Sequence, residues 1–266
     1  MLLSILFLIL SVAFTATVYL AFPSVSLWWL LPIFLGGFLA SIVLYLLFLS
    51  VWTLFLPKKK PIKSPKASCA FMIRITMDCL MRLFGIRVVL KGKEKLPEEP
   101  CVIVSNHLSA FDPMTMLAVM RGRNLVYISK ESNFKIPIAG NFIYHAGFLA
   151  IDRSNGLRAM RTLEHAGTLM RERGVDVGIY PEGTRSKTGE LLRFKPGAFV
   201  LAQKAQSPIA VMTTKGSDRL FKKFSLRPMR VELEVQEVLD RETVMALSRE
   251  ELLNRTREII EAALQK

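Results

Sequence analysis

The first 56 residues of this 266-residue chain contain no Asp, Glu, Lys, Arg or His, so the whole net charge of +14 lies in the remainder. Two apolar stretches, residues 2–21 and 27–56, flank a short break at residues 22–26. A helix needs about 20 apolar residues to cross the hydrocarbon core of a bilayer, so residues 1–56 predict a transmembrane helical hairpin. A hairpin that lies within one leaflet is the alternative. The lack of basic residues before the first stretch argues against a cleaved signal peptide.

Cysteine and histidine are also scarce, with three residues of each type. Cys69, Cys79 and Cys101 are odd in number and lack the spacing of metal ligands, so we interpret them as small core residues in a reducing compartment. The chain contains no Gly-x-Ser-x-Gly string, which excludes the nucleophile elbow of a serine hydrolase.

Basic residues are concentrated directly after the apolar segment, where five lysines occur: Lys58, Lys59, Lys60, Lys63 and Lys66. The positive-inside rule then places the following domain on the cytoplasmic face of the membrane. Each lysine also attracts anionic phospholipids by about 1 kcal/mol near the surface. Because no aromatic residues interleave with these lysines, we expect membrane lipids as partners and no nucleic acid. The sequence therefore predicts an integral membrane protein, and we favour the bacterial inner membrane over the endoplasmic reticulum.

The charged remainder divides into a juxtamembrane part, residues 57–84, and a larger domain, residues 85–266. The juxtamembrane part consists of the lysine-rich linker and an amphipathic helix over residues 67–84. In the domain, strand and helix patterns alternate. The strands are expected at 87–90, 101–105, 125–129, 148–151, 175–179, 209–213 and 230–238. The helices are expected at 113–120, 137–144, 155–173, 196–205 and from 248 onward. This alternation predicts an α/β fold with a mostly parallel sheet flanked by helices, preceded by the hairpin.

A polar string with a histidine and an aspartate follows the expected strand 101–105. His107 precedes Asp112 by five residues, and a neutral imidazole is the usual base for removing a proton from an alcohol. The base needs a partner on its other ring nitrogen, and Asp112 can reach back across the loop to supply it. In the alternative reading, Asp112 only caps the next helix and His107 is an ordinary loop residue. Asp112 can also serve both purposes.

A second polar string, residues 180–186, follows the expected strand 175–179. Arg185 offers a planar fork that suits a phosphate, and Gly183 lets the backbone approach a ligand closely. Glu182 can accept a hydrogen bond from a hydroxyl of the substrate. The alternative is a turn with a solvated Arg–Glu pair. Because ligands bind beyond the carboxyl ends of parallel strands, the two strings are expected to form one site.

The two strings together resemble motifs of the glycerolipid acyltransferase family, which includes the 1-acyl-sn-glycerol-3-phosphate acyltransferases. Residues 106–112 match its first motif, and residues 180–186 match its third, with Tyr180 where Phe is usual. Residues 194–199 match the stretch that follows, and residues 207–211 match the fourth motif poorly. The second block is visible as Lys130, Pro137, Gly140, Gly147, Asp152 and Arg153. The resemblance covers about residues 85–215.

The resemblance implies a reaction and a set of site residues. His107 and Asp112 would be catalytic, and the fatty acyl group of acyl-CoA or acyl-carrier-protein would pass to the 2-hydroxyl of lysophosphatidate, giving phosphatidate. The expected substrate-binding residues are Lys130, Arg153, Glu182, Gly183, Thr184 and Arg185. No metal or cofactor is implied, because the acyl donor is a co-substrate.

Three alternatives stay open at this point. The acceptor can be glycerol 3-phosphate or another lysophospholipid. A lipid hydrolase would use His107 to activate water, although Arg185 favours transfer to a phosphate-bearing acceptor. A membrane-tethered binding module would need no base, which the His107–Asp112 pair argues against.

Overall fold

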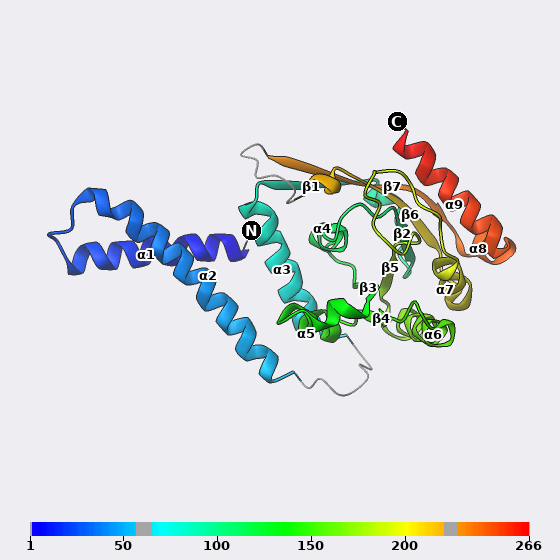
Figure 1. The fold of residues 1–266 in the computed structure, drawn as a ribbon, viewed down its shortest axis with the longest axis horizontal. Coiled ribbons are helices and arrows are strands. Elements are labelled where there is room, and N and C mark those ends of the chain that lie inside the picture. Colours follow the sequence, from blue (N-terminus) through cyan, green and yellow to red (C-terminus); the bar gives the residue numbers. More distant parts are fainter. Residues whose placement is uncertain (1, 57–64, 221–227, 266) are drawn as a thin grey trace.

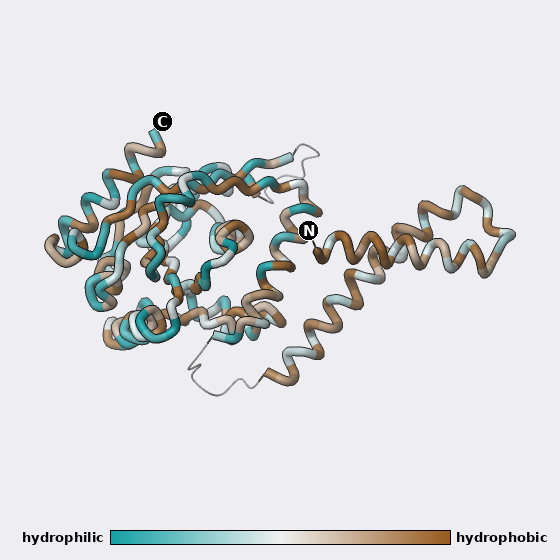
Figure 2. The backbone as a smooth tube through the Cα atoms, turned by 180° about the vertical axis from the view of Figure 1, so that it is seen from behind, coloured by the Kyte–Doolittle hydropathy of each residue, from teal (hydrophilic) through white to brown (hydrophobic). Residues whose placement is uncertain are grey.

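The N-terminal apolar segment forms a helical hairpin. The computed structural model describes residues 2–56, 65–220 and 228–265, and Lys58, Lys59, Lys60 and Lys63 lie outside them. Helices α1 (Leu2–Ala21) and α2 (Leu30–Leu54) are joined through a 3-10 turn, η1 (Leu27–Trp29). Figures 1 and 2 show this predominantly apolar hairpin projecting from the rest of the molecule. By length and composition, Leu2–Ala21 and Leu27–Leu54 are each able to cross a membrane, which indicates membrane association.

Small residues allow the two hairpin helices to approach each other. A Cβ atom on Gly37 would lie 2.8 Å from the ring of Phe14, so the absent side chain makes room for that ring. Ser11 donates a hydrogen bond to the carbonyl of Phe34 at 2.5 Å. Small residues are typical of helix contacts in membranes, where burial from water does not drive association.

Helix α3 (Ala67–Leu83) lies between the hairpin and the domain. We expected an amphipathic linker helix, and its buried residues are Cys69, Met72, Ile73, Cys79 and Met81. Cys79 packs against Leu3 and Phe7 of the hairpin, and the other four belong to the core of the domain. The helix packs against α1 on one side and against α4, α5 and β1 on the other. Hairpin and domain are therefore joined by a packed interface as well as by the chain.

A sheet of seven strands forms the centre of the domain. The strands are β1 (Ile86–Lys91), β2 (Val102–Ser105), β3 (Leu125–Lys130), β4 (Leu149–Ile151), β5 (Asp176–Ile179), β6 (Ile209–Lys215) and β7 (Met229–Leu239). Their spatial order is β1-β7-β6-β2-β5-β3-β4, and all neighbours are parallel except the antiparallel pair β6–β7. The predicted fold class, a mostly parallel sheet preceded by a helical hairpin, is confirmed. The parallel block β6-β2-β5-β3-β4 carries the site described below.

Helices cover both faces of this sheet (Figure 1). The remaining helices are α4 (Asp112–Val119), α5 (Ala139–His145), α6 (Gly156–Arg173), α7 (Gly197–Ala205), α8 (Arg241–Ala246) and α9 (Arg249–Leu264). Short 3-10 turns are η2 (Lys93–Lys95), η3 (Glu131–Lys135) and η4 (Ser217–Arg219). Helices α3, α4 and α5 cover one face, and α6, α7 and α9 cover the other. Ser248 and Glu251 form the capping box expected at the start of α9.

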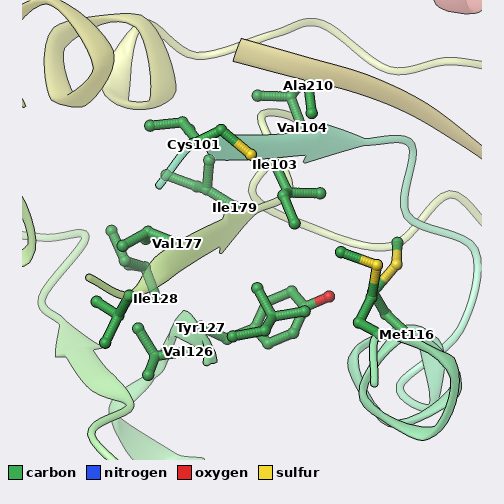
Figure 3. Close-up of a cluster of buried hydrophobic side chains, with 14 of the residues drawn as sticks. Cys101, Ile103, Val104, Met116, Val126, Tyr127, Ile128, Val177, Ile179 and Ala210 are labelled. Atoms are coloured by element: carbon green, nitrogen blue, oxygen red, sulfur yellow. The ribbon is translucent and has the colours of Figure 1, made fainter. Parts of the chain in front are cut away.

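The core fills the space between the sheet and the helices. Figure 3 shows side chains from β2, β3, β5 and β6 packed together with Met116 of α4. Strand β2 is buried along its full length, as an apolar strand in a parallel sheet should be. Gly178 of β5 is required here, because a Cβ atom would lie 2.3 Å from the ring of Tyr127. The three cysteines are buried and unpaired, as expected for small core residues.

Candidate active site

The predicted site residues gather at one edge of the sheet. Strands β2, β5, β3 and β4 are consecutive neighbours and run parallel, so their carboxyl ends lie together. His107 follows β2, the 180–186 string follows β5, Lys130 ends β3, and Arg153 follows β4. Residues far apart in the sequence therefore meet where an α/β sheet offers a binding crevice.

The histidine and the aspartate of the first string form a dyad. His107 Nδ1 lies 2.8 Å from Asp112 Oδ2, and the Asp112 side chain is fully buried. When Nδ1 carries the proton and donates it to Asp112, Nε2 keeps a lone pair and is available as a base. The His107 side chain is 17% exposed, so a substrate can reach it while the carboxylate behind it stays dry.

The structure corrects the expectation that Asp112 caps the next helix. Asp112 is the first residue of α4, the N-cap position belongs to Phe111, and no side-chain capping bond is present there. Instead, Asp112 Oδ2 accepts hydrogen bonds from the backbone N–H groups of Leu108 and Ser109, at 2.7 and 2.8 Å. The carboxylate is turned back into its own loop because three donors converge on that oxygen.

A buried carboxylate joins the two polar strings. Glu182 is 2% exposed, and its oxygens accept the backbone N–H groups of His107 at 2.7 Å and Leu192 at 3.0 Å. Burial raises the pKa of Glu182, while the two amide donors oppose this shift. The N–H of Ser186 also donates to the carbonyl of His107 at 2.8 Å. Glu182 therefore has the geometry of a positioning residue, which differs from the direct contact with a substrate hydroxyl that we expected.

Asn106 ties the histidine loop to β6. Its amide nitrogen donates to the carbonyl of Thr214 at 3.0 Å, and its amide oxygen accepts the N–H of Thr214 at 2.7 Å. The buried amide of Asn106 thus makes the two hydrogen bonds to β6 that a strand backbone would make beyond the end of β2. Sequence reasoning gave Asn106 no role. The only feature of the sequence that could have indicated a role for Asn106 is its position directly before His107.

Three aromatic rings form a column beside the dyad. The His107 ring stacks on Tyr180 with centroids 4.2 Å apart and an interplanar angle of 15°. Tyr180 lies parallel to Tyr127, at 5.6 Å and 7°. Burial raises the pKa of both phenols, so they stay neutral at physiological pH. The column fixes the plane of the imidazole, and sequence reasoning did not identify Tyr127 as part of the site.

The exposed side of the site is rich in cations. Gly183 has a φ of +67°, the left-handed conformation that favours glycine, and its carbonyl accepts a hydrogen bond from Arg153. Thr184 and Arg185 are exposed on the same loop, and Lys130 is exposed at the end of β3. Further exposed cations on or near this loop are Lys187, Arg193 and Lys195. The structure thus brings Arg153 onto the 180–186 loop and leaves Arg185 free to meet an anion from solvent.

Comparisons with known proteins agree with this arrangement. Residues 87–215 match the family model described as Acyltransferase. Human 1-acyl-sn-glycerol-3-phosphate acyltransferase beta is 40% identical over 127 residues, which are 47% of this chain and 45% of that protein. The human alpha enzyme is 37% identical over 139 residues, covering 52% of this chain and 49% of its own. The chain thus spans about half the length of the curated relatives it matches.

A solved structure extends the similarity to the fold of the whole chain. The crystal structure of the 1-acyl-sn-glycerophosphate acyltransferase PlsC from Thermotoga maritima superposes with a TM-score of 0.64 at 24% identity. The match covers 99% of this chain and 94% of the other, so it includes the N-terminal hairpin. At this identity the likeness shows the fold, and the sequence matches over residues 87–215 carry the relationship. Over residues 87–215 this chain is thus similar in sequence to the 1-acyl-sn-glycerol-3-phosphate acyltransferases, and as a whole it has the fold of PlsC.

Proposed function

We propose that this chain transfers a fatty acyl group from acyl-CoA or acyl-carrier-protein to the 2-hydroxyl of lysophosphatidate, forming phosphatidate. The observation that carries the proposal is the His107–Asp112 dyad, held at 2.8 Å beside a loop of exposed cations. His107 would remove the proton of the acceptor hydroxyl, and the cations would bind the phosphate of the same acceptor. The similar human proteins bear the name of this activity.

The reaction follows from the geometry of the dyad. Nε2 of His107 removes the proton from the acceptor hydroxyl while the oxygen attacks the thioester carbonyl of the donor. The tetrahedral intermediate then expels the thiolate, which takes the proton back from the imidazolium. Asp112 keeps Nδ1 protonated and stabilises the positive charge on the ring between the two steps. No covalent acyl-enzyme is required, because the acceptor itself is the nucleophile.

Arginine and lysine side chains hold the acceptor phosphate. The exposed guanidinium of Arg185 suits bidentate contact with phosphate oxygens, and Arg153 and Lys130 add charge from the ends of β4 and β3. Arg153 also anchors the loop through the carbonyl of Gly183. Binding both reactants in fixed orientation supplies several kcal/mol of the barrier reduction, on the order of the values known for intramolecular reactions.

An apolar cavity supports an aliphatic substrate. It has a volume of about 250 Å³ and lies between helices α2, α3, α4 and α5. Met114, two residues after Asp112, lines it together with Leu46, Met72 and Phe142. A cavity between the membrane hairpin and the catalytic helix is a suitable place for an acyl chain that leaves the bilayer. The lysines after α2 favour the cytoplasmic face, where the acyl donor is available.

The test is an assay of the full-length protein in detergent micelles with labelled acyl-CoA and lysophosphatidate. Wild type is expected to form phosphatidate, and His107→Ala is expected to lower turnover by about 10²- to 10⁴-fold, the usual contribution of a general base. His165→Ala is the matched control, because this histidine lies on α6 and is remote from the dyad in sequence. Acyl-carrier-protein and other lysolipids are then compared as donor and acceptors.

Two outcomes would contradict the proposal. The first is free fatty acid released at the same rate with and without lysophosphatidate, which identifies a hydrolase. The second is phosphatidate formation by His107→Ala at the wild-type rate, which removes the base from the mechanism.

A further inference from the structure

Three buried polar atoms without a hydrogen-bond partner lie around the dyad. In the described part of the chain seven such side-chain atoms occur, and among them are Asp112 Oδ1, Tyr127 Oη and Tyr180 Oη. Asp112 Oδ2, by contrast, accepts three hydrogen bonds. Buried polar groups are nearly always paired, so a concentration of unpaired ones behind a reactive residue calls for an explanation.

The two tyrosines and Asp112 lie on elements that meet at the site. Tyr127 stands on β3, and Figure 3 shows its hydroxyl turned toward α4, the helix that Asp112 begins. Tyr180 stacks between His107 and Tyr127. The negative charge of Asp112 acts on both phenols and helps burial to raise their pKa. The two hydroxyls also interact with each other, so both phenols and Asp112 belong to one buried polar group.

We propose that Tyr127 and Tyr180 are positioning residues of the dyad, whose hydroxyls donate to Asp112 Oδ1 and hold the carboxylate in its catalytic orientation. This inference rests on the proposed role of His107 as the general base. The structure does not show these bonds, and catalytic hydrogen bonds commonly tighten only when substrate binds.

The hydroxyl of Tyr180 distinguishes this chain from the motif it resembles. The motif that residues 180–186 resemble usually has Phe at the first position. A Phe would stack on His107 in the same way but would bring no hydroxyl. At the other end of the column, Gly178 leaves space that any Cβ atom would fill, and the Tyr127 ring occupies it.

Few charged groups compete for Asp112. The titratable groups that act on it in the described structure are His107, Glu182, Tyr127 and Tyr180. Glu182 is a second anion, and both of its oxygens are held by backbone amides. Met72 and Ile73 of α3 line a cavity together with Met114 of α4, and both are apolar. The nearest charged pair between α3 and the end of α4 is Asp78–Arg121, in which Arg121 is exposed.

The phenol donors should limit the basicity of the dyad. A carboxylate whose charge is shared between donors on both oxygens stabilises the imidazolium less than one with an unsatisfied oxygen. Loss of the hydroxyls therefore lets Asp112 stabilise the imidazolium more strongly. The acid limb of the kcat/KM profile then moves to higher pH.

The experiment compares Tyr180→Phe, Tyr127→Phe and the double variant in the full-length protein, which keep the rings and remove only the oxygens. We expect the acid limb of the double variant to move up by about one pH unit and kcat to fall about tenfold, the effect of losing a hydrogen bond to a charged group, with KM for lysophosphatidate unchanged. Single variants show part of the shift. Thr256→Val is the matched control, because it removes a buried unpaired hydroxyl on α9 and should leave the profile unchanged.

The inference is overturned if the acid limbs of both single variants and of the double variant superpose on the acid limb of the wild type. The single variants keep the test valid if the double variant does not fold, which circular dichroism establishes. His107→Ala separates this result from failure of the proposed function. An inactive His107→Ala with unshifted tyrosine variants rejects only the role of the hydroxyls, whereas an active His107→Ala rejects the base itself.

Discussion

Two buried aspartates at opposite ends of the sheet have different surroundings. Asp176 begins β5, at the edge away from the candidate site, and Asp112 follows β2 at the site edge. Asp176 accepts hydrogen bonds from Arg123 Nε at 2.5 Å, from Arg123 Nη2 at 2.6 Å and from the N–H of Cys101 at 3.0 Å. Asp112 has an imidazole and two backbone donors on one oxygen and no partner on the other.

The difference separates a stabilising pair from a reactive one. Arg123 is permanently charged, and it also donates to the carbonyls of Pro97 and Glu99, so it ties the segment before β2 to β5. Both carboxylate oxygens of Asp176 accept hydrogen bonds. The partner of Asp112 is His107, which gains and loses a positive charge during the proposed reaction. A carboxylate with one unpaired oxygen can respond to that change. Sites with incomplete compensation are where function is expected.

The largest effect should come from Asp112→Asn. The amide keeps the size of the side chain but presents a donor or a weaker acceptor to His107, which favours the wrong tautomer and removes the charge that stabilises the imidazolium. We expect kcat to fall about 10³- to 10⁴-fold, as for the equivalent change in other His–Asp pairs. The measurement is phosphatidate formation at saturating lysophosphatidate.

The thermal midpoint of Asp112→Asn should stay close to that of the wild type. A large loss of stability with normal turnover per folded molecule would reverse the assignment, and Asp112 would then resemble Asp176.

The same substitution at Asp176 should act on stability instead. Asp176→Asn leaves the partly buried guanidinium of Arg123 without its counter-charge, and breaking a buried pair costs at most about 3–5 kcal/mol of unfolding free energy. Chemical denaturation of the protein in detergent measures the loss. Turnover per folded molecule should equal that of the wild type, since Asp176 lies at the opposite edge of the sheet. A fall in kcat without a fall in stability would show that the two edges are coupled.

The sequence predicted the parallel block and the meeting of the two strings, because both depend on local patterns. Strand β2 is a continuous apolar run, and a polar string directly after such a run must lie at a carboxyl end. The capping box of α9 was predicted for the same reason, since Ser248 and Glu251 are three residues apart. The pairing of His107 with Asp112 needed only a five-residue loop.

What the sequence did not predict depends on contacts between distant segments. Asn106 pairs with Thr214, and Glu182 with the backbone of His107, across separations that no periodicity reveals. Tyr127 belongs to the site only because β3 lies beside β5 and Gly178 admits its ring. The expected capping role of Asp112 was wrong because propensity at a helix start could not weigh three donors in the preceding loop.

A smaller effect is expected from Glu182→Gln, which sharpens the comparison with a third buried carboxylate. The amide places a donor against one of the backbone N–H groups that Glu182 accepts, and the mismatch should destabilise the protein by about 1–3 kcal/mol. Burial raises the pKa of Glu182 above its ordinary 4.5. A raised pKa means that the wild type loses stability as pH increases from about 4.5 through the folded-state value.

The stability difference between wild type and Glu182→Gln should therefore shrink as pH rises through that window. Denaturation curves of both proteins between pH 4 and 7 test the sign. A difference that grows with pH would mean that the two amide donors outweigh burial, and Glu182 would then belong with Asp176 as a fully compensated carboxylate.

The smallest effect is expected at Glu251, where an exposed carboxylate completes the capping box of α9. Its side chain accepts the N–H of Ser248 at 2.7 Å, and hydrogen bonds from Ser248 lower the pKa of Glu251 below its ordinary 4.5. A lowered pKa reverses the sign found for Glu182: the stabilisation is present above pH 4.5 and is lost as pH falls through the folded-state value. Glu251→Gln keeps an acceptor but does not titrate, so its deficit in thermal midpoint should appear above pH 4.5 and vanish in acid. Two glutamates of one protein would thus respond to pH in opposite directions, because one gains donors at the surface and the other is buried between loops.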